Sequence, residues 1–251
     1  MTQELDDKAP LLDHLIELRR RLTYSVVAIM VGFFACYAFA EEVFAFLVAP
    51  LKSVAGSHSK MIFTGLHEAF FTYMKVSFYA GLFLTAPFVL WQLWIFIAPG
   101  LYKNEKKVFL PFLVMTPVLF FTGATLAYTL VFPLVFKYFL SFSTPSMESL
   151  PSVREYLDLV LSLLFAFGIV FEMPVGLLLL IKVRLLSTKA LVAKRKYFIV
   201  LAFIIAGLLV PPDPFSQVMA AIPLIILYEA SIMIGRLLEK DQVEAEVRKE
   251  Q

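Results

Sequence analysis

Glu172 is an acidic residue near the middle of the apolar segment 159–181, which contains no lysine or arginine to neutralise it. An ionisable side chain at mid-membrane costs about 2.5–3.5 kcal/mol even on insertion scales, and such residues usually face a bundle interior or a watery cavity. Gly168 and Gly176 lie one turn to either side, and small residues there leave room around the carboxyl. Pro174 removes a backbone donor beside the acid and favours a local helix defect. Glu172 is therefore a candidate functional residue, the alternative being a protonated, hydrogen-bonded packing role.

Two further acids stand inside basic segments: Glu17 in HLIELRRRL and Glu105 in LYKNEKK. One interpretation is a solvated charge that balances its neighbours at a membrane surface. The other is recognition of a cation, because a carboxylate can accept an arginine guanidinium bidentately. If the fold brings Glu17 and Glu105 together, they could receive a pair of arginines. Their spacing alone does not show that they converge.

Other site chemistries find no support in the sequence. Cys36 is the only cysteine, so an intramolecular disulfide is impossible and a metal–thiolate site implausible. The three histidines, His14, His58 and His67, are scattered without ligand spacing, and no nucleotide-binding motif is present. We therefore predict no cofactor, no metal ion, no nucleic-acid partner and no enzymatic activity.

The composition is that of an integral membrane protein. Of the 251 residues, 60% are hydrophobic, whereas soluble globular domains have about 45–50%. The apolar runs are continuous and do not alternate, which favours helices over a β-barrel. We predict an all-α polytopic membrane protein with six transmembrane helices, at about 22–40, 70–98, 108–136, 159–181, 197–210 and 215–234. The last two spans are short, and 197–210 is expected to thin the bilayer locally.

The distribution of basic residues predicts the orientation. Even spacing of six spans puts both termini on one side of the membrane, and that side carries 17 of the 22 lysines and arginines. By the positive-inside rule, both termini are expected in the cytoplasm. The predicted organisation is a six-span membrane domain over residues 1–236, followed by a charged cytoplasmic tail over 237–251.

Several motifs follow one another from about His14 to Arg236: HLIELRRRL with Ala49-Pro50, WIFIAPGLYKNEKK, AYTLVFPL, FAFGIVFEMPV and PPDPFSQ. In this order they resemble the TatC family, the multispanning component of the twin-arginine protein translocase. The resemblance implies a concave, glove-like bundle in the cytoplasmic (inner) membrane. It also implies a receptor for the twin-arginine signal peptides of folded proteins, which recruits single-span TatA/TatB-type subunits and other copies of itself. Export would be driven by the proton gradient.

The resemblance also implies roles for particular residues. Six would bind the signal peptide: Glu17, Arg19, Arg21, Phe96, Glu105 and Glu172. Tyr128, Asp213 and Gln217 match positions of the polar wall and of partner docking, and Pro50 matches a position in the first periplasmic loop. Many family members carry a hydroxyl residue just before PPD, whereas this chain has Val210 there.

Without the family resemblance, the residues alone are compatible with two other functions. A proton-coupled small-solute transporter would use Glu172 as its proton carrier and Glu229 as a second titrating site. Glu229, however, lies about two turns from Arg236, which favours an ordinary acid near the cytoplasmic interface. An assembly scaffold without client recognition is the second alternative.

Overall fold

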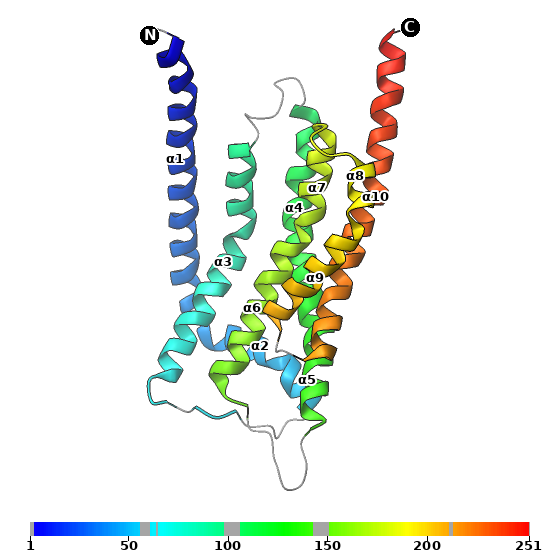
Figure 1. Cartoon of the computed structure of the whole chain (residues 1–251). Helices are drawn as coiled ribbons and strands as arrows, with labels where there is room; N and C mark the ends of the chain where they lie inside the picture. Colours follow the sequence, from blue (N-terminus) through cyan, green and yellow to red (C-terminus); the bar gives the residue numbers. More distant parts are fainter. Residues whose placement is uncertain are drawn as a thin grey trace. The chain divides into compact units, whose positions relative to one another are not determined.

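The structure is a computed structural model that describes residues 3–55, 61–63, 65–97, 106–142, 151–210 and 213–250. The described chain is helical, apart from one isolated parallel bridge between Ile62 and Ser152. The helices (Figure 1) are α1 (Gln3–Tyr37), α2 (Ala40–Ala55), α3 (Glu68–Ile97), α4 (Lys106–Leu126), the π-helix η2 (Ala127–Val131), α5 (Phe132–Leu140), α6 (Val153–Phe171), α7 (Met173–Lys182), α8 (Thr188–Ala193), α9 (Arg195–Leu209) and α10 (Pro214–Glu250). The predicted all-α class is confirmed.

Four helical segments are long and apolar enough to cross a membrane among the described residues: Glu68–Phe96, Pro111–Leu140, Val153–Lys182 and Pro214–Lys240. A fifth arises if α1 from His14 and α2, which meet at a bend of 85°, count as one broken span. The segment predicted at 197–210 forms α9, whose 15 residues give about 22 Å at helical rise, short of a hydrocarbon core of about 30 Å. The six-span count and the local thinning therefore stay predictions.

The chain divides into two compact units. The first comprises Met1–Phe46 and Gly65–Pro117, and in it α1 (blue in Figure 1) and α3 (cyan) pack along one another. Their crossing point is Gly32 against Gly81: a Cβ on Gly32 would lie 2.8 Å from the carbonyl oxygen of Gly81. Small residues let membrane helices approach this closely, and the gain in van der Waals packing is what joins them in lipid. This crossing fixes the register of α1 on α3.

The second unit comprises Leu47–Thr64 and Val118–Gln251, with α10 in contact with α6, α7, α8 and α9. Its largest fully buried side chains include Phe132, Phe167 and Leu224. Gly123 lets α4 approach α6, because a Cβ there would lie 2.5 Å from the carbonyl oxygen of Phe167. Large apolar side chains therefore fill this interior, while single glycines set the helix spacing.

One buried tyrosine ties α6 to α2 inside the second unit. Tyr156 is 5% exposed, and its hydroxyl donates a 2.7 Å hydrogen bond to the backbone carbonyl of Leu47. We expect Tyr156→Phe to lower the free energy of unfolding by about 1–2 kcal/mol, because a buried hydrogen bond between α6 and α2 is lost. Tyr197→Phe, at a site that is 66% exposed, is the matched control and should change stability little. Thermal unfolding in detergent micelles measures both, and equal effects would contradict this prediction.

Candidate functional site

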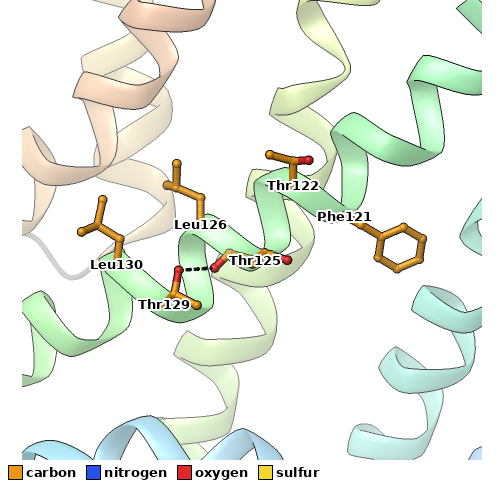
Figure 2. A pocket seen from close by; sticks show the side chains of 6 residues that line it. All are labelled: Phe121, Thr122, Thr125, Leu126, Thr129 and Leu130. Atoms are coloured by element: carbon orange, nitrogen blue, oxygen red, sulfur yellow. Dashed lines mark hydrogen bonds between the residues drawn. The ribbon is translucent and has the colours of Figure 1, made fainter.

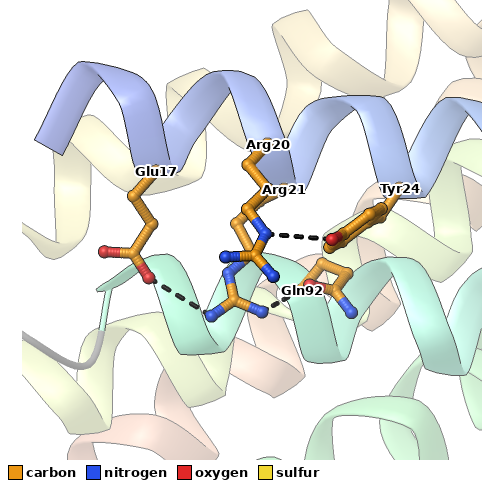
Figure 3. A network of polar contacts seen from close by, with 5 residues as sticks. All are labelled: Glu17, Arg20, Arg21, Tyr24 and Gln92. Atoms are coloured by element: carbon orange, nitrogen blue, oxygen red, sulfur yellow. Dashed lines mark hydrogen bonds and ion pairs between the residues drawn. The ribbon is translucent and has the colours of Figure 1, made fainter. Parts of the chain in front are cut away.

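Three polar side chains from α1 and α3 form a connected chain in the first unit (Figure 3). Arg21 Nη2 donates to Glu17 Oε1 at 3.2 Å, and Arg21 Nη1 donates to Gln92 Oε1 at 2.9 Å. Glu17 and Arg21 are four residues apart and so share one face of α1, which faces α3. Gln92, on α3, is only 7% exposed. The Arg21 guanidinium is therefore held between a carboxylate of its own helix and an amide of the facing helix.

The other two arginines of the run differ from Arg21. Arg20 Nε donates to the hydroxyl of Tyr24 at 2.9 Å, one turn further along α1 and on the exposed side. Arg19 is exposed and lies about 200° around the helix from Glu17. The structure thus brings Glu17 and Arg21 together, whereas Arg19 points from another face of α1.

Phe96 lies half-buried near the end of α3, where its ring stacks on the imidazole of His14 with 4.3 Å between ring centroids. His14 is on α1, one turn before Glu17, so Phe96 reaches the same end of the first unit as that acid. Glu105, the second predicted acid, lies outside the described residues. The structure brings Glu17, Arg21 and Phe96 to one end of the α1–α3 pair.

A buried hydrogen bond connects α3 to α4 on either side of the segment that carries Glu105. Trp94 Nε1 donates to Thr116 Oγ1 at 2.8 Å, and the two residues are 5% and 0% exposed. A buried indole N–H needs such an acceptor, so the pair ties the end of α3 to the first half of α4. No sequence motif predicts a role for Trp94, Thr116 or Gln92. The signals available for them are a tryptophan and an amide within an apolar run.

Glu172 lies at a break in the helix of its segment. It is the single non-helical residue between α6 and α7, and Pro174 stands in the first turn of α7. Its backbone N–H donates to the carbonyl of Ile169 at 3.0 Å, and its side-chain Oε1 is buried. The helix defect predicted beside Pro174 is present in the structure.

The room predicted around Glu172 exists on one side only. A Cβ on Gly168 would lie 2.6 Å from the ring of Phe120, so this glycine lets α4 pack closely against α6. A Cβ on Gly176 would meet nothing within 4 Å. The open space therefore lies on the α7 side of the acid, and an aromatic ring fills the α6 side.

An open groove of about 490 Å³ runs along the face of α4 and the π-helix (Figure 2). It is lined by Phe121, Thr122, Thr125, Leu126, Thr129 and Leu130. Thr129 Oγ1 donates to the carbonyl of Thr125 at 2.8 Å, and Thr122 Oγ1 donates to that of Val118 at 2.7 Å. The hydroxyl groups of Thr122 and Thr129 thus donate to the backbone of their own helix. Tyr128 lies in the same π-helix, with its ring 6.1 Å from that of Phe132.

Asp213 and Gln217 hold the start of α10. Asp213 Oδ1 accepts the backbone N–H of Ser216 at 2.8 Å, which is the contact of a helix N-cap. Gln217 Nε2 donates to the carbonyl of Phe203 on α9 at 2.9 Å. Gly207 permits this approach, because a Cβ there would lie 2.8 Å from Gln217 Nε2. Both predicted residues thus secure the junction of α9 with α10.

Glu229 and Pro50, two other residues singled out by the sequence, also have defined contacts. Glu229 Oε2 accepts from Arg195 Nη2 at 2.6 Å, which joins the start of α9 to α10. Pro50 is buried within α2, and its carbonyl accepts the Ser53 hydroxyl at 2.7 Å. Within the described ranges, no group of three or more histidine, cysteine, aspartate or glutamate side chains could hold a metal ion.

Comparison with known proteins gives consistent matches over nearly the whole chain. The family model described as Sec-independent protein translocase protein (TatC) matches residues 13–223. Sec-independent protein translocase protein TatC of Magnetococcus marinus is 59% identical over 250 residues, covering 100% of this chain and 92% of that protein. The Escherichia coli K12 protein of the same name is 39% identical over 232 residues, covering 92% and 90%. The crystal structure of a twin-arginine translocase receptor, TatC, superposes with a TM-score of 0.81 at 40% identity, covering 90% of this chain and 99% of that one.

Proposed function

Since this chain belongs to the TatC family and is a component of the Sec-independent protein translocase, we propose that it is the receptor for twin-arginine signal peptides. In this proposal the arginine pair of a client docks at Glu17 and Glu105, and Arg19, Arg21 and Phe96 shape the surface around it. The likeness to a solved twin-arginine translocase receptor at 40% identity supports this role.

The observation that carries the proposal is the contact between Glu17 and Arg21. The carboxylate already accepts a guanidinium, at 3.2 Å, and the two side chains are 32% and 26% exposed. A partly exposed carboxylate in this setting is oriented and still accessible. It can accept further hydrogen bonds, because each carboxylate oxygen has two acceptor sites. A client arginine is the cation whose planar fork matches such a group.

In the second unit, Glu172 would line the path of the client's apolar segment. Its place at a helix break, with open space beside Gly176, supports this assignment. Tyr128, Asp213 and Gln217 would form the polar wall at which single-span TatA/TatB-type subunits dock, and other copies of this chain would join the assembly. The protein is a multi-pass membrane protein. We assign it to the cytoplasmic membrane, with both termini in the cytoplasm and the proton gradient as energy source.

A proton-coupled transporter finds less support. That alternative needs Glu229 as a second titrating group, whereas the described ion pair with Arg195 gives Glu229 a structural role between α9 and α10. Membership of a protein translocase family also argues for protein cargo and against an enzymatic activity. We therefore place Glu172 in a receptor.

Site-specific photocrosslinking tests the proposal. A photoreactive phenylalanine analogue replaces Phe96 or Glu105, and the same analogue at Phe34, an exposed residue in the last turn of α1, is the control. The ligand is a twin-arginine signal peptide, or the same peptide with both arginines changed to lysine. We expect labelling at Phe96 and Glu105 that requires the arginines, and little labelling at Phe34. Equal labelling by the two peptides would contradict the receptor function.

A further inference from the structure

We propose that Gln92 is a positioning residue that makes the Glu17 surface select arginine over lysine in the client. Gln92 acts through Arg21, whose orientation fixes the carboxylate of Glu17. This inference rests on the proposed receptor function and concerns the specificity of the same site.

The geometry begins with a guanidinium held at two of its nitrogens. Arg21 Nη1 donates to Gln92 Oε1 at 2.9 Å and Nη2 donates to Glu17 Oε1 at 3.2 Å, as Figure 3 shows. Because the guanidinium is planar, two anchored nitrogens fix its plane as well as its position. The two acceptors lie on different helices, Gln92 on α3 and Glu17 on α1. The Arg21 side chain therefore cannot swing away without breaking at least one of these hydrogen bonds.

Gln92 is the rigid member of this chain of contacts. It is 7% exposed, whereas Glu17 and Arg21 are 32% and 26% exposed. An ion pair four residues apart on an exposed helix is weak and leaves both side chains mobile. The hydrogen bond to the buried Gln92 amide holds Arg21 in place. The Glu17 carboxylate, which accepts from Arg21, is thereby held in one orientation.

A fixed carboxylate discriminates between the two client cations. Arg21 occupies one acceptor position on Oε1, which leaves Oε2 and the second position of Oε1 for an incoming group. An arginine fork bonds both oxygens only if it lies in the carboxylate plane, so its affinity depends on orientation. A lysine ammonium is a compact charge that binds from any direction. Loss of orientation should therefore weaken arginine binding and leave lysine binding nearly unchanged.

The test compares two peptides on three variants of the full chain in membrane vesicles that contain its translocase partners. Gln92→Met keeps the length of the side chain but removes the amide acceptor. Gln92→Glu keeps an oxygen acceptor for Arg21. Ser77→Ala removes a fully buried hydroxyl from the same helix, away from Arg21, and is the control. The measured quantity is the ratio of dissociation constants for the dilysine and diarginine forms of one labelled signal peptide.

We expect Gln92→Met to lower that ratio about fivefold, mainly through weaker diarginine binding. Gln92→Glu and Ser77→Ala should keep it within about twofold of wild type. The ratio is insensitive to the folded fraction, because both peptides titrate the same protein. If Gln92→Met weakens both peptides equally, or Gln92→Glu behaves like Gln92→Met, the positioning role is wrong while the receptor function stands. A wild-type protein that binds the two peptides equally would instead overturn the receptor function.

Discussion

Gly81→Ala is expected to lower the free energy of unfolding by about 3 kcal/mol, the upper range for forcing an extra methyl group into a packed interior. A Cβ on Gly81 would lie 2.5 Å from the backbone nitrogen of Phe33 and 2.6 Å from the backbone carbon of Gly32. Both atoms are backbone, so no flexible side chain can yield. The helices α1 and α3 must then move apart.

Gly176→Ala is the matched control for this prediction. Both substitutions add one methyl group to a helical glycine in an apolar segment, but at Gly176 nothing lies within 4 Å of the new atom. There alanine should be neutral or stabilise by about 0.5–1 kcal/mol through its helix propensity. Thermal unfolding in detergent micelles measures both variants. Equal stability of the two would show that α1 and α3 do not cross at Gly32 and Gly81.

Glu17→Gln is expected to weaken binding of a twin-arginine signal peptide by about tenfold to a hundredfold, the range for losing a hydrogen bond to a charged group. Glutamine keeps the shape of the side chain but removes the negative charge. Arg21 Nη2 donates to Glu17 Oε1 at 3.2 Å, and without the carboxylate the positive charge of Arg21 would repel the client's arginines. The loss should therefore exceed that of one neutral hydrogen bond.

Titration of a labelled peptide onto vesicles at several salt concentrations measures this effect. Glu155→Gln is the control, since Glu155 is an exposed acid in the first turn of α6. Affinity of the wild type should fall with salt more steeply than that of Glu17→Gln, because screening acts on the charge that the variant lacks. A Glu17→Gln affinity within about twofold of wild type would remove Glu17 from the proposed site.

The class of the fold and the break at Glu172 followed from local sequence features. Long uninterrupted apolar runs predict helices, because the bilayer core holds no water for the backbone N–H and C=O groups and a helix pairs these groups within the run. Pro174 predicts a defect beside the acid, because it lacks an N–H. Both features lie within one continuous segment, so they can be recognised without knowing which other helix packs against it.

Features that depend on pairing between distant helices could not be predicted in the same way. Gln92 stands 71 residues from Arg21, and only the register set at Gly32 and Gly81 brings them into contact. Gly168 was expected to leave room beside Glu172, but the ring of Phe120 on another helix occupies that space. A glycine indicates a close approach, and the sequence does not say what approaches.

The π-helix between α4 and α5 has a consequence for the tolerance of this chain to insertion and deletion. Its wider turn, Ala127–Val131, accommodates one residue more than an α-helical turn would. Removing one residue from it would let the turn rewind as α-helix and leave the facing of α5 nearly unchanged, because five π-helical residues turn the chain through about the same angle as four α-helical ones. Phe132 and Val135, which are 0% exposed, would then stay in the interior they now fill. The same deletion in the regular α-helix before the π-helix would instead rotate α5 by about 100° and turn these side chains away from that interior.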